Sequence, residues 1–204
     1  MKISYLFQPK YLARRIAYKF YEISHPDEPW IAQGAIRFCE NHLTKEHIGL
    51  EWGSGRSTVW FGARLKSILS IEYDRQWYFT VMNQLHEQGI KNVECRHIPL
   101  DHDRQEPTYP HYEKIPKYVS VIENFADSTL DFVVVDGHYR QACVLAALAK
   151  LKPGGLLLVD NTNRLPIKEW GVPLDWSIVH QSSNVMTETT IWQKPETAEQ
   201  KYGK

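Results

Sequence analysis

Residues 48 to 74 constrain the fold of this chain more than any other stretch. A short apolar run that includes Glu51 leads into two glycines separated by one residue, Gly53 and Gly55. A helical pattern follows, and the chain then returns as a second apolar run that ends at Glu72. This order is typical of a strand, a glycine turn, a helix and a second, parallel strand. Glycines let the backbone approach a ligand closely, and the helix that follows offers free N–H groups to an anion.

The spacing of these residues resembles motifs I and II of the class I S-adenosyl-L-methionine-dependent methyltransferases. Glu51 precedes the first glycine by two residues, the third glycine of a dinucleotide-binding turn is absent, and Glu72 ends the next strand. The resemblance implies that Glu51, Gly53, Ser54 and Gly55 bind the methionine end of the cofactor. It implies that Glu72 binds the two ribose hydroxyls.

Alternating strand and helix patterns continue along the chain. Helical periodicity recurs after Asp74 and over residues 139–151, and a short apolar run follows each. Two runs of alternating polarity, 176–181 and 189–193, indicate an antiparallel hairpin. The resemblance therefore implies an α/β, Rossmann-like class I methyltransferase fold: a seven-stranded, mostly parallel sheet with helices on both faces and an antiparallel last strand.

We expect three segments: an N-terminal helical cap over 1–45, a Rossmann-like methyltransferase domain over 46–194 and a disordered tail over 195–204. The amphipathic, basic helix expected over 10–24 fits two interpretations, a helix laid over the core with a solvated basic face, or an arm for a peripheral membrane contact or a partner. The proline-rich stretch 99–117 is expected to be a loop, either a substrate lid or surface decoration.

Four expected strands end in acids, which are Glu51, Glu72, Asp136 and Asp160. In an open α/β sheet the ligand crevice lies beyond the carboxyl ends of the strands, so we expect these acids to share one rim. Each acid alone also suits a helix cap or a turn. Their concurrence predicts a binding site, and we assign Asp136 to the cofactor as well.

A finer resemblance concerns the metal-dependent O-methyltransferases similar to the catechol and caffeoyl-CoA enzymes. Asp136, Asp160 and Asn161 match the three positions that hold Mg²⁺ in those enzymes, and oxygen ligands of this kind suit magnesium. Metal-free methyltransferases also carry acids at these strand ends, so the metal stays open. Where those enzymes commonly carry a lysine, this chain has Tyr139. His138 is the candidate catalytic base in its place, since an imidazole titrates near neutrality, and we assign Asp160 a catalytic role too.

The composition gives no reason to expect a nucleic-acid substrate. Lys plus Arg and Asp plus Glu are 24 each, so the formal net charge is zero. Asp136 is not followed by Pro-Pro-Tyr, the signature expected for methylation of an amino group. No apolar run approaches the ~20 residues of a membrane span, and we expect a cytoplasmic protein without a secretory signal. The three cysteines lack metal-site spacing and are expected to be reduced.

We therefore predict an S-adenosyl-L-methionine-dependent methyltransferase that acts on a small-molecule or glycan-like acceptor, at oxygen. A non-catalytic Rossmann-like module that binds the cofactor for regulation is the main alternative. An RNA methyltransferase and an NAD-dependent oxidoreductase are further alternatives, and the absent third glycine disfavours the oxidoreductase.

Overall fold

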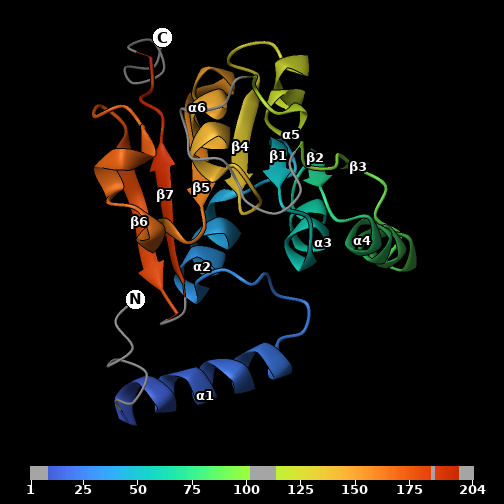
Figure 1. The fold of residues 1–204 in the computed structure, drawn as a ribbon, viewed down its shortest axis with the longest axis vertical. Coiled ribbons are helices and arrows are strands. Elements are labelled where there is room, and N and C mark those ends of the chain that lie inside the picture. Colours follow the sequence, from blue (N-terminus) through green and yellow to red (C-terminus); the bar gives the residue numbers. More distant parts are fainter. Residues whose placement is uncertain (1–8, 102–113, 185–186, 198–204) are drawn as a thin grey trace.

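A seven-stranded sheet with the strand order β3-β2-β1-β4-β5-β7-β6 forms the centre of the molecule (Figure 1). The computed structural model describes residues 9–101, 114–184 and 187–197. The strands are β1 (Ile48–Trp52), β2 (Ser67–Glu72), β3 (Val93–His97), β4 (Leu130–Val135), β5 (Leu151–Val159), β6 (Ser177–Ser183) and β7 (Glu188–Gln193). Strands β1 to β5 pair in parallel, and β7 lies antiparallel between β5 and β6. The predicted fold class is confirmed.

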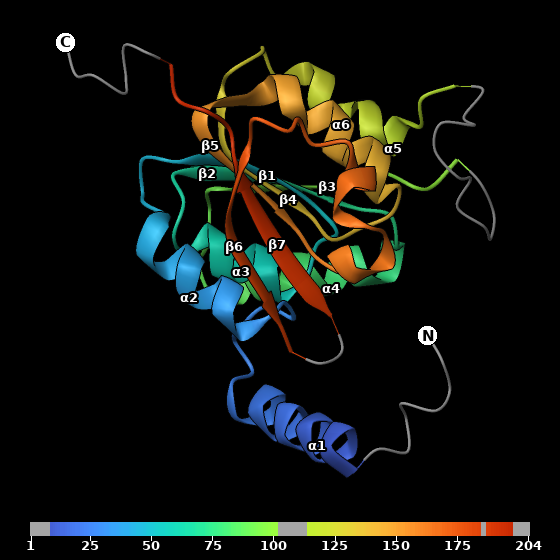
Figure 2. The same cartoon turned by 90° about the vertical axis from the view of Figure 1, so that its left-hand side faces the viewer.

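Helices cover both faces of this sheet (Figure 2). The helices of the described chain are α1 (Pro9–Ser24), which does not cover the sheet, α2 (Gln33–His42), α3 (Arg56–Gly62), α4 (Arg75–Glu87), α5 (Lys117–Ser120) and α6 (Arg140–Lys150). Short 3₁₀ turns lie at Val121–Asn124, Thr162–Arg164 and Ile167–Trp170. Side chains of α2 and α3 pack on one face, and those of α5 and α6 pack on the other.

In β4 the four consecutive residues 132–135 are all apolar, with no alternation of polar and apolar side chains. Phe132 and Val134 point into the α2 and α3 layer, whereas Val133 and Val135 point into the α5 and α6 layer. Successive side chains of a strand point to opposite faces, so a strand covered on both sides needs an apolar residue at every position.

Strand β5 begins earlier than the sequence predicts. Proline and glycine at 153–155 indicate a break, yet the strand runs unbroken from Leu151. The register with β4 shifts between Leu130 and Phe132, and this irregularity accommodates the extra residues. Gly154 adopts a φ of 78° and donates its N–H to the carbonyl of Lys194, so the backbone groups of this segment stay paired.

Helix α1 lies apart from the sheet in both views (Figures 1 and 2). Ile16, Phe20 and Ile23 on its predicted apolar stripe are 50%, 68% and 68% exposed, so the stripe does not cover the core. Within the described part of the chain, no helix is long and apolar enough to cross a membrane. Most of the predicted loop 99–117 and of the predicted tail lies outside the described residues.

Candidate functional site

The glycine turn after β1 packs directly against the turn after β4. Gly53 has a φ of 95°, and a Cβ placed on it would lie 2.7 Å from the backbone nitrogen of Gly137. A side chain is therefore excluded both by the conformation and by the neighbouring backbone. The Asp136-Gly137 turn and the glycine turn form one edge, as the register of parallel β1 and β4 requires.

Glu51 lies beneath the glycine turn and is fully buried. Its Oε2 accepts hydrogen bonds from the hydroxyls of Thr58, at 2.5 Å, and Ser70, at 2.6 Å. Ser54 in turn contacts Ser70, with 2.7 Å between their hydroxyl oxygens. Burial raises the pKa of Glu51, and the hydroxyls partly oppose that rise. Glu51 therefore points into the protein beneath the turn and lines neither cavity described below, although it was expected at the rim. Its contact with the cofactor stays a prediction.

Glu72 and Asp136 contribute to the walls of a cavity of about 690 Å³ beside the glycine turn. Its lining residues are Gly53, Ser54, Glu72, Tyr73, Asp74, Gln76, Trp77, Thr80, Asp136, Gly137, His138, Arg140 and Arg164. The Glu72 side chain accepts a 2.7 Å hydrogen bond from the backbone nitrogen of Asp74, which fixes its orientation. Burial raises the pKa of Glu72 to about 7.

Trp77 closes the cavity from the side of α4. Asp74 caps this helix by accepting a 2.7 Å hydrogen bond from the backbone nitrogen of Trp77. The indole nitrogen of Trp77 donates to the carbonyl of Ser54, also at 2.7 Å. The helix after β2 is thus attached to the turn after β1, and both walls of the cavity are held together.

Arg140 ties the ends of β4 and β5 to each other. Its Nη2 donates to both the carbonyl and the Oδ1 of Asp136, each at 2.8 Å, its Nε donates to Gly137, and its Nη1 donates to the carbonyl of Asp160. Burial raises the pKa of Asp136, while the guanidinium of Arg140 lowers it. Oδ2 of Asp136 accepts no hydrogen bond from the described residues and is available to a ligand.

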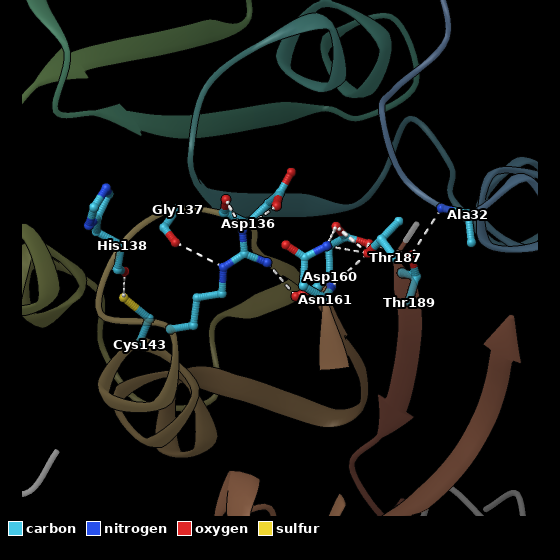
Figure 3. A network of polar contacts seen from close by, with 10 residues as sticks. Ala32, Asp136, Gly137, His138, Cys143, Asp160, Asn161, Thr187 and Thr189 are labelled. Carbon is cyan, nitrogen blue, oxygen red and sulfur yellow. Dashed lines mark hydrogen bonds and ion pairs between the residues drawn. The ribbon is translucent and has the colours of Figure 1, made fainter. Parts of the chain in front are cut away.

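Asp160 is anchored by the last strand of the sheet (Figure 3). Thr189 donates to its Oδ1 at 2.6 Å, Thr187 contacts both oxygens at 2.9 Å, and the amide of Asn161 donates to Oδ2 at 2.7 Å. Thr189 also accepts the backbone N–H of Ala32 at 3.0 Å, so the segment before α2 joins the network. Burial raises the pKa of Asp160, and the threonine hydroxyls oppose the rise.

This donor set does not fit the predicted magnesium site. Both oxygens of Asp160 already accept hydrogen bonds, Oδ1 of Asp136 is paired with a guanidinium, and the side-chain nitrogen of Asn161 donates to Asp160 and Thr187. A magnesium ion needs several unengaged oxygens in octahedral geometry. Among the described residues, no group of three or more His, Cys, Asp and Glu side chains is placed to hold a metal.

A second cavity, of about 840 Å³, lies between α1 and the carboxyl edge of the sheet. Its lining residues are Arg15, Ile16, Tyr18, Lys19, Glu22, Trp30, Asp136, Asp160, Asn161, Asn184 and Thr187. Asp136 contributes to both cavities, so they adjoin at this carboxylate. The two predicted catalytic residues lie in different cavities: Asp160 lines the second, and His138 lines the first. The ring centroids of His138 and Tyr73 are 4.4 Å apart.

The overall fold of the chain matches a group of solved structures. A methyltransferase from Geobacter sulfurreducens aligns with a TM-score of 0.59 at 12% identity, covering 89% of each chain. An rRNA methylase from Streptococcus thermophilus aligns with a TM-score of 0.58 at 15% identity, covering 79% of this chain and 95% of that one. The chain has the class I methyltransferase fold.

A third solved structure with this fold contains a cofactor product. A putative methyltransferase from Streptococcus mutans, in complex with S-adenosylhomocysteine (SAH), aligns with a TM-score of 0.56 at 14% identity, covering 78% of this chain and 95% of that one. No family model matches the chain, and a search of curated proteins gives no match either.

Three residues of the site escaped the sequence reasoning: Arg140, Thr187 and Thr189. Arg140 follows Asp136 by four residues, the spacing of an ion pair on a helix, which is a signal that the sequence does contain. Thr187 and Thr189 are two residues apart and so share one face of an extended segment. Their partner Asp160 lies 27 and 29 positions away, and no local pattern indicates that pairing.

Proposed function

We propose that the protein is an S-adenosyl-L-methionine-dependent methyltransferase. One observation carries the proposal: a side-chain-free turn at Gly53 and a buried acid at Glu72 border one cavity, and a second cavity adjoins it at Asp136. Both volumes fall in the ~300–1,000 Å³ range of small-molecule sites. The pairing of a cofactor cavity with an acceptor cavity is what group transfer requires.

The residues of the first cavity suit the predicted cofactor. Glu72 supplies a carboxylate for a ribose diol, and Gly53 and Gly137 bring two backbone turns without side chains to the wall of the same cavity. When bound, S-adenosyl-L-methionine supplies an electrophilic methyl group on a positively charged sulfur. The acidic character of the Glu72 and Asp136 walls suits that positive charge.

The second cavity suits a hydroxylated acceptor. Asn161, Asn184 and Thr187 contribute neutral polar side chains to its lining, and Trp30 adds an aromatic surface. Oxygen methylation forms a carbon–oxygen bond to the methyl group, breaks its carbon–sulfur bond and releases the hydroxyl proton. We assign Asp136 to receive that proton, in preference to the predicted His138, because Asp136 lines both cavities and its burial favours the protonated form.

Calorimetry and a turnover assay test this function together. We expect the wild-type chain to bind SAH and to convert S-adenosyl-L-methionine to it in the presence of a suitable acceptor from panels of phenols, glycans and RNA. Asp136→Asn is expected to retain SAH binding within a few-fold and to lose most transfer, because the amide cannot accept the proton. Binding without turnover on every panel would favour the regulatory module, and binding of NADH in place of SAH would favour an oxidoreductase.

A further inference from the structure

Helix α1 carries an apolar stripe that faces solvent. Ile16, Phe20 and Ile23 follow one another at intervals of four and three residues, so they share one face of the helix. The three residues are between 50% and 68% exposed. Single exposed apolar side chains are ordinary, but a continuous row of them marks a surface that binds something.

The opposite side of α1 is attached to the rest of the protein, which fixes the direction of the stripe. Tyr18 forms a hydrogen bond with the side chain of Asn184, just after β6. The hydroxyl of Tyr21 donates to the carboxylate of Glu28, in the segment that leads to the core. Tyr18 and Phe20 are two residues apart and so point about 200° apart on the helix. The stripe is therefore held facing away from the sheet.

The same helix concentrates positive charge. Its sequence contains four basic residues and one acidic residue, which are Lys10, Arg14, Arg15, Lys19 and Glu22. The net charge of α1 is thus +3, whereas the whole chain has a formal net charge of zero, so the remainder carries −3. Lys19 precedes Ile23 by four positions and its side chain is 74% exposed, which places a positive charge beside the stripe.

Two kinds of partner cover an exposed apolar stripe, a second copy of the chain or a lipid surface. Three side chains offer roughly a few hundred Å², whereas a stable protein interface takes ~800 Å² from each partner. A symmetric contact would also bring α1 against an equally positive α1. An anionic bilayer accepts apolar side chains at headgroup depth and supplies the opposite charge. Both the area and the charge therefore favour lipid.

We propose that α1 binds the surface of an anionic lipid bilayer through Ile16, Phe20 and Ile23, with its basic residues on the lipid headgroups. Binding of this kind goes beyond methyl transfer and does not depend on it. Ile16 and Lys19 also line the second cavity. A protein docked in this way holds that cavity next to the lipid headgroups.

Vesicle flotation with the full chain tests this docking. One set of vesicles is phosphatidylcholine alone, and the other contains about 30% phosphatidylserine. We expect the wild type to bind the anionic vesicles at least about tenfold more tightly than the neutral ones, and to lose this preference as the salt concentration rises.

Two variants separate the apolar from the electrostatic contribution. Phe20→Gln combined with Ile23→Gln is expected to weaken binding to anionic vesicles by at least about tenfold, because two apolar side chains no longer enter the bilayer. Lys19→Gln is expected to weaken the same binding by about fivefold and to leave binding to neutral vesicles unchanged. All three side chains are exposed, so thermal unfolding is expected to stay like that of the wild type.

Phe79→Gln provides a matched control. Phe79 is also an exposed phenylalanine on a helix, 52% exposed on α4. Helix α4 has one basic and one acidic residue, Arg75 and Glu87, so it lacks the positive charge of α1. We expect this variant to bind both kinds of vesicle like the wild type.

Three results would overturn the inference. The first is a wild type with no preference for anionic vesicles, and the second is a Phe20→Gln/Ile23→Gln variant that binds them as the wild type does. The third is a wild type that sediments as a dimer and does not float with vesicles, while the double variant is monomeric. That result would assign the stripe to a contact between two copies of the chain.

Discussion

The proposed contact of Glu72 with the cofactor's ribose predicts that cofactor affinity depends on pH, in the direction set by the raised pKa of this carboxyl. Burial raises the pKa of this carboxyl to about 7 in the free protein. Only the ionised form presents two acceptor oxygens to the ribose hydroxyls, so binding must first remove the proton. The apparent dissociation constant is the intrinsic one divided by the ionised fraction, which is about one eleventh at about pH 6 and about nine tenths at about pH 8. SAH is therefore expected to bind about tenfold more tightly at the higher pH.

Calorimetric titration with SAH across this interval measures the effect. Glu72→Gln removes the titrating group while keeping an acceptor oxygen, so its affinity is expected to be lower and nearly flat over the same range. Asp136 shares the cavity and also has a raised pKa, hence the titration is repeated with Asp136→Asn. The remaining charged or titratable neighbours are Tyr73, Asp74, His138, Arg140 and Arg164. A wild-type affinity that is the same at both ends of the interval would refute the reasoning.

The raised pKa of Glu72 also affects folding stability, which is expected to fall as pH rises, whereas cofactor affinity is expected to rise. Because the folded-state pKa of Glu72 lies above the ordinary glutamate value of 4.5, the folded protein binds more protons than the unfolded chain between that value and about 7. The free energy of unfolding contributed by this group falls as pH rises through that window, by up to about 3 kcal/mol. Glu72→Gln is expected to remove this fall, as measured by urea unfolding along the pH series.

Three further perturbations follow from the site. Gly53→Ala is expected to abolish SAH binding and to destabilise the fold by about 2 kcal/mol or more in denaturant unfolding, since its Cβ meets the Gly137 backbone. Thr189→Val removes a donor to Asp160 and the acceptor of the Ala32 N–H, so thermal unfolding should show a loss of about 2 kcal/mol, whereas Thr80→Val on α4 should show little change. EDTA is expected to leave methyl transfer unchanged, because the oxygens of Asp160 are already engaged; a loss reversed by added magnesium would contradict this.

The individual elements and the sheet edge that borders the first cavity were predictable because local patterns specify them. The glycine turn at Gly53, the helix cap at Asp74 and the apolar run of β4 each specify their own conformation. The inward position of Glu51 was not predictable, since a residue two positions before a turn can point under it or into the cavity, and only the hydroxyls of Thr58 and Ser70 decide.

Contacts between residues far apart in the chain could likewise not be predicted from the sequence. The pairing of Asp160 with Thr189 depends on the insertion of an antiparallel strand beside β5, which no short-range signal reports. The proline and glycines at 153–155 follow the end of α6, but β5 starts before them, because a register shift against β4 accommodates these residues within the strand. The exposed stripe of α1 shows that helical periodicity predicts the helix but not its neighbour.

The hydroxyl of Thr189 joins three parts of the chain that a ribosome delivers at very different times. It receives the N–H of Ala32 and donates to the carboxylate of Asp160, so the earliest of these three residues waits for the last strand to be made. Synthesis proceeds from the N-terminus, and the acceptor side of the molecule can assemble only when nearly the whole chain has emerged. Until then the nascent chain contains the glycine turn after β1, but the second cavity beside it is incomplete.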